Sequence, residues 1–365
     1  MPIASGAGGT PAPSPSDIIW RGDARGVVLH HSTQPSPGLE RLLSHTIWGD
    51  ADIKYRVLGI AGILASIADP HYITLENEQA VIGGMVCGRR DTTIRGRPCK
   101  ALHIAMLAID PAYGGRGFGP LLAKRSKPFL FDLVDGTGVV YLYVEGTHHA
   151  SIELHRRLGY RDLCRLDAHI FSRLVPDASD ALRTIDSGER ASVVQSLEAA
   201  YPDHALVDFD QSVIPERYYV LDAPGQIRCG AQISEMRWSL EGLPGPAGYF
   251  TLNILPHIPG LYGQFRPSDF RFLRVSNILS PADRPEALDK LLEACLADHG
   301  VNAAMLFMDP RSPVQQRIIA NLQLGLADRL IGGKAQVLAD FTGLDDSEIA
   351  WFTTHPMIAS PMDAI

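Results

Sequence analysis

The fold is decided by one stretch, Ile104-Ala-Met-Leu-Ala-Ile-Asp-Pro-Ala-Tyr-Gly-Gly-Arg-Gly-Phe-Gly-Pro-Leu-Leu122. An apolar segment, which predicts a strand, runs into a glycine-rich turn and then into a segment that predicts a helix. Glycines let backbone N–H groups converge without interference from Cβ atoms, and a helix N-terminus adds the positive end of its dipole. The turn is therefore predicted to hold a diphosphate, with Arg116 beside it. The alternative is a tight strand-to-helix turn that binds nothing.

Two common nucleotide loops do not match this turn. The dinucleotide pattern G-x-G-x-x-G requires a glycine at the position where Leu122 stands. The phosphate loop of nucleoside triphosphatases requires G-K-[ST], and that sequence does not follow. The turn therefore belongs to another type.

The turn resembles the acyl-CoA loop of the GNAT acetyltransferase superfamily, which reads [Q/R]-x-x-G-x-[G/A] after a strand that ends near a proline. Here the motif runs from Gly114, which stands where the family usually has Gln or Arg, to Gly119. A second family motif, Asn-x-x-Ala-x-x-Leu-Tyr-x-x-x-Gly-Phe, resembles residues 148–160, in which His155 replaces the tyrosine. The resemblance implies acetyl-CoA as co-substrate and no metal. It places the cofactor against Leu107, Ala108, Ile109, Gly114, Gly115, Arg116, Gly117, Phe118, Gly119, His148 and Ser151.

The predicted fold class is α/β (α+β), with a mixed, mostly antiparallel sheet flanked by helices in each of two GNAT-like domains. Hydrophobic periodicity predicts one or two helices over 39–67, broken around residues 49 and 50. Further helices are predicted from about residue 119 and over 149–158. Strands are predicted over 26–31, 72–76, 80–89, 102–109 and 139–144.

Acyl transfer to an amine needs a base, because a protonated amine is not nucleophilic. Family members that acetylate histones carry a glutamate on the strand before the loop, and His103 holds that place here. Alternation predicts that His103, Ala105, Leu107 and Ile109 share one face of the strand. A histidine with an unperturbed pKa of ~6.5 could accept the proton at neutral pH. A buried histidine satisfied by a neighbour is the other interpretation.

Two more residues are candidates for proton transfer. His155 occupies the position of the family's tyrosine acid, with an exposed helix histidine as the alternative. Glu145, at the end of a strand, is a candidate base that acts through water. His148 and His149 lack a third ligand at metal-binding spacing, so a metal site is not expected there.

The acceptor side is predicted from the resemblance alone. The helices after the first strand cover the acceptor in this family, which points to Trp48, Tyr55 and the apolar segment 57–68. That segment is either core or the lining of a hydrophobic acceptor or acyl-chain site.

The chain also repeats itself. The stretches beginning at Tyr72, Ile94 and His155 recur in the same order at Tyr219, Leu240 and Asn321. Repetition of this kind predicts a duplicated domain. The expected divisions are a disordered tail over 1–18, a catalytic domain over 19–176, a linker over 177–190 and a degenerate GNAT-like domain over 191–365.

The second half lacks a glycine loop. Its corresponding stretch, residues 277–288, is acidic and free of glycine, so it would repel a diphosphate. This half is therefore expected to act either as a packing partner or as a wall of the acceptor site.

Composition narrows the classes of function. The chain has 365 residues, with 33 Lys and Arg against 41 Asp and Glu, a net charge of −8 that argues against a nucleic-acid partner. No apolar stretch is long enough to span a membrane, and the five scattered cysteines predict neither a disulfide framework nor a zinc site. The N-terminus does not resemble a secretory signal. A cytoplasmic protein is expected, and a homodimer stays open.

These observations predict an acetyl-CoA-dependent N-acetyltransferase whose acceptor is an amine of a small molecule. One alternative is a non-catalytic acyl-CoA-binding regulator, favoured by the unusual residues His148 and His155. Another is a protein-lysine acetyltransferase, which the absence of a peptide-docking motif disfavours.

Overall fold

The computed structural model describes residues 17–22, 26–49, 53–254, 257, 266–284, 286–325 and 327–363. The disordered tail predicted for 1–18 lies outside the described residues as far as residue 16, and Asp17 and Ile18 begin the first strand. The first half contains β1 (Asp17–Arg21), β2 (Val28–Ser32), α1 (Pro37–His45), β3 (Lys54–Val57), α2 (Ile60–Ser66), β4 (Pro70–Glu76), β5 (Val81–Ile94), β6 (Arg97–Ile109), α3 (Phe118–Asp132), β7 (Gly138–Glu145), α4 (His149–Arg157) and β8 (Arg161–Ser172).

The second half continues with shorter strands at its start. It contains β9 (Arg183–Thr184), α5 (Arg190–Ala200), α6 (Phe209–Ser212), β10 (Tyr218–Val220), β11 (Gly230–Gly242), α7 (Gly245–Asn253), β12 (Phe270–Leu279), α8 (Glu286–His299), β13 (Ala303–Met308), α9 (Pro313–Asn321), α10 (Ala327–Ile331), β14 (Gly333–Thr342) and α11 (Asp346–Thr354).

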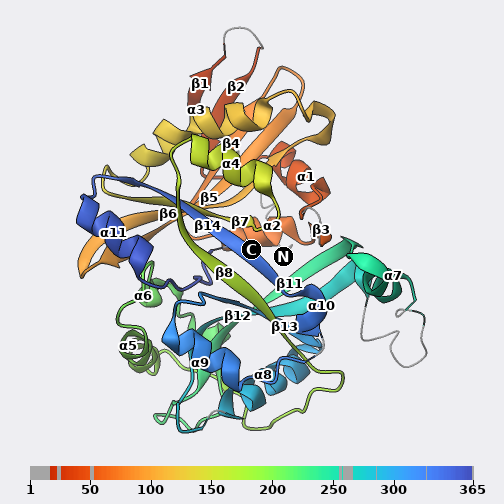
Figure 1. Ribbon diagram of the computed structural model, residues 1–365, viewed down its shortest axis with the longest axis vertical. Coiled ribbons are helices and arrows are strands. Elements are labelled where there is room, and N and C mark those ends of the chain that lie inside the picture. The colour runs from red at the N-terminus through yellow and green to blue at the C-terminus, as the bar shows by residue number, and fades with distance from the viewer. Residues whose placement is uncertain are drawn as a thin grey trace, which may run out of the picture.

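One mixed sheet runs through both halves, with helices against its faces (Figure 1). Its strand order is β1-β2-β4-β5-β6-β7-β14-β8-β13-β12-β11-β10-β9, and β3 pairs with β11 outside this path. The named strands pair antiparallel except at β6–β7 and β12–β13, which are parallel. The predicted fold class, a mostly antiparallel α/β sheet flanked by helices, is therefore confirmed.

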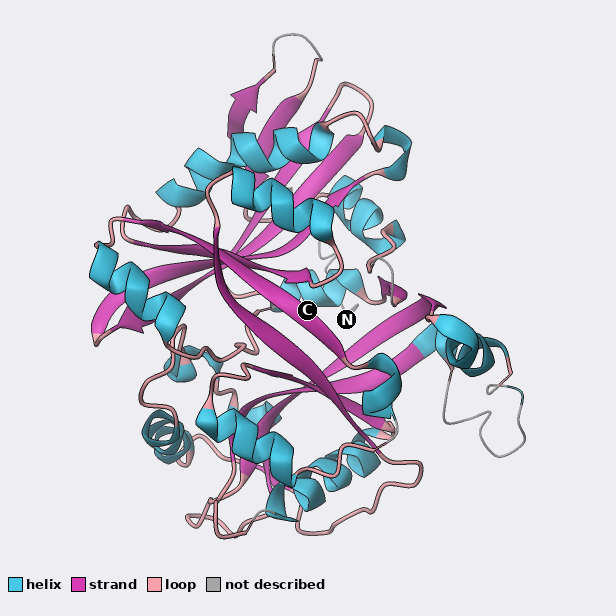
Figure 2. Cartoon of the chain, viewed as in Figure 1, coloured by secondary structure: helices cyan, strands magenta, loops and turns pink. Residues whose placement is uncertain are grey.

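The halves are joined by an exchange of strands at the middle of the sheet. β14, the last strand of the chain, lies between β7 and β8 and pairs antiparallel with both. β8 in turn pairs with β13 of the second half. Figure 2 shows these strands crossing the centre of the molecule in one continuous sheet. The domain boundary predicted at 177–190 stays a prediction. In the sheet, β14 from after this boundary lies between β7 and β8 from before it.

The order of elements around the parallel strands is the same in both halves. β6, α3 and β7 are followed by α4, and β12, α8 and β13 are followed by α9. A parallel pair needs a crossover connection, and a helix supplies it in each case. The glycine turn and its acidic counterpart thus occupy equivalent strand-to-helix junctions.

The predicted helical region 39–67 is two helices with a strand between them. In α1, Ser36 caps the N-terminus by accepting from the backbone N–H of Leu39. Leu39, Leu42 and Leu43 then share one face at helical spacing and are buried. The strand between the helices, β3, was missed because its pairing partner β11 is far away in sequence.

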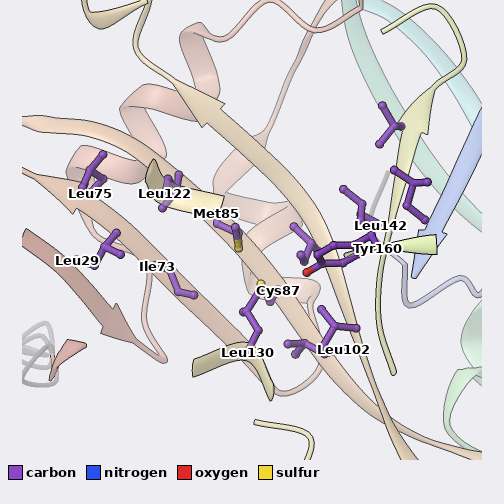
Figure 3. Packing of buried hydrophobic residues seen from close by; sticks show 14 of the residues in the cluster. Leu29, Ile73, Leu75, Met85, Cys87, Leu102, Leu122, Leu130, Leu142 and Tyr160 are labelled. Carbon is purple, nitrogen blue, oxygen red and sulfur yellow. The ribbon is translucent and has the colours of Figure 1, made fainter. Parts of the chain in front are cut away.

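Two hydrophobic clusters meet at β6. The first packs α3 against the sheet, where Leu122 and Leu130 approach Met85 and Cys87 of β5 (Figure 3). The other lies on the opposite face and is covered by α1, α2 and β3. It draws residues from both halves: Leu39, Tyr55, Met106, Ala108, Ile170, Trp238, Phe272 and Met305. This second face is therefore built jointly by the two halves.

Candidate functional site

The two parallel strands of the first half separate at one end. β6 pairs with β7 from Lys100 and Gly138 as far as Ile104 and Leu142. Beyond that point β6 stays bonded to β5 through Ile109, whereas β7 stays bonded to β14 through Glu145. Backbone N–H and C=O groups of β6 that would have met β7 are thus available to another extended partner.

A β-bulge accompanies this separation. Val86 pairs with Met106, but the next residue, Cys87, pairs with Ile104, so Ala105 is the extra residue. The bulge reverses the alternation of β6. The prediction that His103, Ala105, Leu107 and Ile109 share a face is therefore wrong: Leu107 and Ile109 pack on the α3 side, and His103 lies on the other.

The glycine turn lies directly beyond the separated end of β6. A short 3-10 turn, Pro111–Tyr113, is capped by the side chain of Asp110. Gly115 and Gly117 then adopt positive φ angles of 71° and 78°, a region that favours glycine. Gly117 is the N-cap of α3 and offers no side chain to its N–H groups, so the helix start is open to an anion.

The rest of the turn keeps its backbone accessible. Gly114, Gly115 and Arg116 are exposed, and the Arg116 guanidinium lies 5.7 Å from the centre of the Tyr113 ring. A Cβ built on Gly119 would meet only Ile109 Cγ1, at 3.7 Å, among its described neighbours. The turn therefore fits an acyl-CoA diphosphate, as the resemblance implies.

His103 lies on the face opposite α3, at the base of the separation. It pairs across with Tyr141, and only 3% of its surface is exposed. Its ring packs 4.8 Å from that of Tyr143, and its Nδ1 lies 3.7 Å from Oδ1 of Asp363. Burial lowers the pKa of His103 to about 4, opposed by the Asp363 charge. The ring is therefore neutral at pH 7 with one ring nitrogen unprotonated, and burial makes it a weaker base than a free imidazole.

Glu145 and Tyr55, predicted separately as base and acceptor-site residue, lie together. The Tyr55 hydroxyl donates to Oε1 of Glu145 at 3.4 Å. Burial, reinforced by the Glu145 charge, raises the pKa of Tyr55, so Tyr55 stays a hydrogen-bond donor. Trp48 forms an isolated bridge with Tyr55. The contact joins β3 to the separated end of β7.

His155 belongs to α4, on the same face of the sheet as α3, and it is buried rather than exposed. Its Nδ1 is 2.9 Å from the backbone oxygen of Ser151, which accepts the Nδ1 proton. Nε2 is buried and has no hydrogen-bond partner within the described ranges. Burial lowers the pKa of His155, so the neutral ring offers Nε2 as an acceptor, and an acid role would require its protonation. His148 is the N-cap residue of α4.

Several residues of this region were not found from the sequence. Trp238 of β11 stacks on Tyr55, with ring centres 3.9 Å apart and planes 18° apart. Tyr143 and Asp363 surround His103 together with Arg90. Trp238 and Asp363 are far from β6 in sequence, so only the three-dimensional arrangement brings them to it, whereas Arg90 and Tyr143 lie on the neighbouring strands β5 and β7.

An apolar cavity lies beside Trp238, in the part of the site that the second half supplies. Its lining includes Ile53, Leu240, Leu243, Phe270 and Met305. Among the residues the structure describes, no three His, Cys, Asp or Glu side chains gather to hold a metal ion. No helix in those ranges is long and apolar enough to cross a membrane.

Comparison with known proteins finds similarity to one family over part of the chain. The family described as "Acetyltransferase (GNAT) family" matches residues 41–160. Mycothiol acetyltransferase of Rhodococcus erythropolis is 40% identical over 58 residues, which are 16% of this chain and 19% of that protein. N-alpha-acetyltransferase RimI of Mycobacterium tuberculosis is 35% identical over 80 residues, 22% of this chain and 48% of that protein. The matches thus span less than half of either relative.

The fold of the whole chain is also found among solved structures. N-myristoyltransferase of Saccharomyces cerevisiae, solved with bound myristoyl-CoA, aligns with a TM-score of 0.58 at 10% identity. The alignment covers 93% of this chain and 88% of that one, and at this identity it shows the fold alone. Residues 41–160 thus match the GNAT acetyltransferase family, within a fold that extends through the second half.

Proposed function

We propose that this protein is an N-acetyltransferase that takes acetyl-CoA between β6 and β7 and transfers its acetyl group to an amine. The observation that carries the proposal is the parting of these strands after Ile104 and Leu142, directly beside the glycine turn. Extended β6 backbone, an open helix N-terminus and Arg116 together suit a long, anionic thioester cofactor. The GNAT match over the same residues supports this assignment.

Acetyl-CoA supplies an activated acyl group when it is bound. The chain must then bind the acceptor on the face of the sheet that lies opposite α3. It must also remove a proton from the acceptor's amine. His103 and Glu145 are the proposed bases, because both lie on that face near the separation. Trp48 and Tyr55 are proposed to line the acceptor, with Trp238 of the second half.

The acceptor is proposed to be a small amine. The site has a carboxylate, a tyrosine hydroxyl and an adjoining small apolar cavity, which suit the charge and the apolar part of a compact amine. A second candidate is the α-amine of a peptide, which the 35% identity to an N-alpha-acetyltransferase over 80 residues favours.

The test is thiol release from acetyl-CoA against a panel of small amines and, separately, short peptides with free N-termini. Turnover with small amines alone supports the proposal, and turnover with peptides alone favours the second candidate. Acetyl-CoA binding in calorimetry without turnover on either panel would instead support a non-catalytic regulator.

A further inference from the structure

A buried network of charges lies on the acceptor face, around His103. Asp363, in the segment after α11, accepts hydrogen bonds from the hydroxyls of Tyr141 and Tyr143 through its two carboxylate oxygens. Its carboxylate also lies 3.6 Å from Nη2 of Arg90. The side chain of Asp363 is therefore held in one place from three directions.

The same network fixes the segment that carries Asp363. Arg274 of β12 donates to the backbone oxygens of Ser360 and Asp363. Ser360 donates to Asp208 at 2.6 Å, and Asp208 is bonded to Arg90. The network thus sets the carboxylates of Asp208 and Asp363 against the guanidinium groups of Arg90 and Arg274, all buried. Such a balance is what keeps charged groups stable away from water.

His103 touches this network through Asp363. Nδ1 lies 3.7 Å from Oδ1 of Asp363, whereas Nε2 is buried and lacks a hydrogen-bond partner in the described parts of the chain. A buried ring nitrogen without a partner is costly. His103 is also one residue before Ile104, the last residue of β6 that pairs with β7.

We propose that Asp363 is a positioning residue that orients His103 for proton removal from the acceptor. This inference rests on the proposed function. Asp363 favours the tautomer with hydrogen on Nδ1, which leaves the Nε2 lone pair free. The amine N–H bond breaks, an Nε2–H bond forms, and the electron pair of the broken bond stays on the amine nitrogen. The imidazolium so formed lies beside the Asp363 carboxylate, which stabilises its charge.

The charged and polar groups around His103 determine how a substitution at Asp363 changes the pKa of the ring. They are Tyr141 and Tyr143 of β7, Arg90 of β5, Arg274 of β12 and Asp363. The two arginines lower the pKa of His103, and only the Asp363 charge among these groups raises it. Loss of that charge is therefore expected to lower the pKa further.

The test uses NMR of the full-length protein with isotope-labelled histidine. The His103 signals are assigned by their loss in His103→Gln. We expect the Nδ1–H tautomer in the unaltered protein. In Asp363→Asn, we expect the amide N–H to point at Nδ1, so that the ring changes to the Nε2–H tautomer and titrates at lower pH.

Asp208→Asn is the matched control. It removes a buried carboxylate from the same Arg90 network, but Asp208 is not among the groups that shift the pKa of His103. The inference requires that this variant keep the His103 tautomer and titration. An unchanged His103 in Asp363→Asn, or an equal change in Asp208→Asn, would overturn it.

A kinetic arm applies to any amine that the acceptor screen identifies. Asp363→Asn should lower kcat by up to about 10⁴-fold, the effect seen when the carboxylate that orients a catalytic histidine is replaced by an amide. The affinity for acetyl-CoA should not change, because Asp363 lies on the acceptor face. The NMR result needs no acceptor, so failure of the proposed function and failure of this inference give different outcomes. A normal kcat in a variant with the altered tautomer would also overturn the inference.

Discussion

Tyr55 of the first half stacks on Trp238 of the second, with ring centres 3.9 Å apart. The hydroxyl of the same tyrosine reaches Glu145 at the separated end of β7. The second half therefore contributes to the region where the acceptor is proposed to bind. Whether it shapes the acceptor or only packs there was left open by the sequence, and the stack makes the question testable.

Replacement of Trp238 by leucine tests that contribution. Trp238→Leu keeps an apolar side chain but removes the ring stack and leaves a cavity, so the free energy of unfolding should fall by more than the ~0.5–1.5 kcal/mol of the stack alone. The KM for the acceptor should rise, while the Kd for acetyl-CoA stays unchanged. Trp351→Leu is the control, because Trp351 also stacks on a neighbouring ring, His355, but packs against a different hydrophobic cluster from Trp238. Equal effects of both variants on acceptor KM would argue for packing alone.

Replacement of Tyr55 by phenylalanine removes the hydroxyl and keeps the ring. Tyr55→Phe should reduce kcat if Glu145 takes part in proton transfer, because Glu145 loses a donor that orients it. The cost to stability should be about 0.5–1.5 kcal/mol, the net value of one hydrogen bond. Tyr72→Phe is a matched control, since the buried Tyr72 hydroxyl donates to the backbone oxygen of Leu64 at 2.9 Å. A fall in kcat of the same size in both variants would contradict a role for the Tyr55–Glu145 contact.

The lowered pKa of His103 predicts how stability depends on pH. In the folded protein this pKa is about 4, whereas in the unfolded chain it is ~6.5. Below pH 6.5 the unfolded chain takes up a proton that the folded protein does not, so stability falls as the pH drops towards 4. His103→Gln should reduce the loss of unfolding free energy between pH 7.5 and pH 5 by roughly 2 kcal/mol. Denaturant titrations at both pH values measure it, and an unchanged difference would contradict the buried, neutral state.

Arg116 should contribute to cofactor affinity without being essential. Arg116→Ala is expected to weaken acetyl-CoA binding by ~1–3 kcal/mol, the value of one charge-assisted hydrogen bond. Arg125→Ala serves as the control, because that guanidinium lies over Trp20. If calorimetry shows that the Arg125 variant loses as much affinity for acetyl-CoA, the positive charge of the region would be what attracts the cofactor. A specific contact from Arg116 would then be contradicted.

The sequence predicted the cofactor turn well because its information is local. The glycines at 115 and 117 adopt the positive φ angles for which glycine is favoured, and the strand, turn and helix follow one another within the quoted stretch. The bulge at Ala105 could not be predicted from alternation, since an inserted residue leaves the hydrophobic pattern of each flanking part intact.

The acceptor face was less predictable because its parts are far apart in sequence. Tyr55 and Trp48 were found through the resemblance, but Trp238 reaches them only because β3 pairs with β11. Asp363 reaches His103 only because the segment after α11 returns to the centre of the sheet. His155 was predicted at the position of the family's acid, and its burial depends on packing against Tyr160, which spacing alone does not reveal.

Calorimetric titration of acetyl-CoA into Gly119→Val tests the central claim, that the cofactor binds between β6 and β7 on the glycine turn. Gly119 suits the test because its φ angle is not positive and a Cβ meets only Ile109 among the described residues, so the variant should fold. Gly333→Val, at the start of β14, is the control, since no described atom lies near its Cβ position. The account predicts that Gly119→Val loses acetyl-CoA binding while Gly333→Val keeps it. Undiminished affinity in a folded Gly119→Val protein would contradict the account.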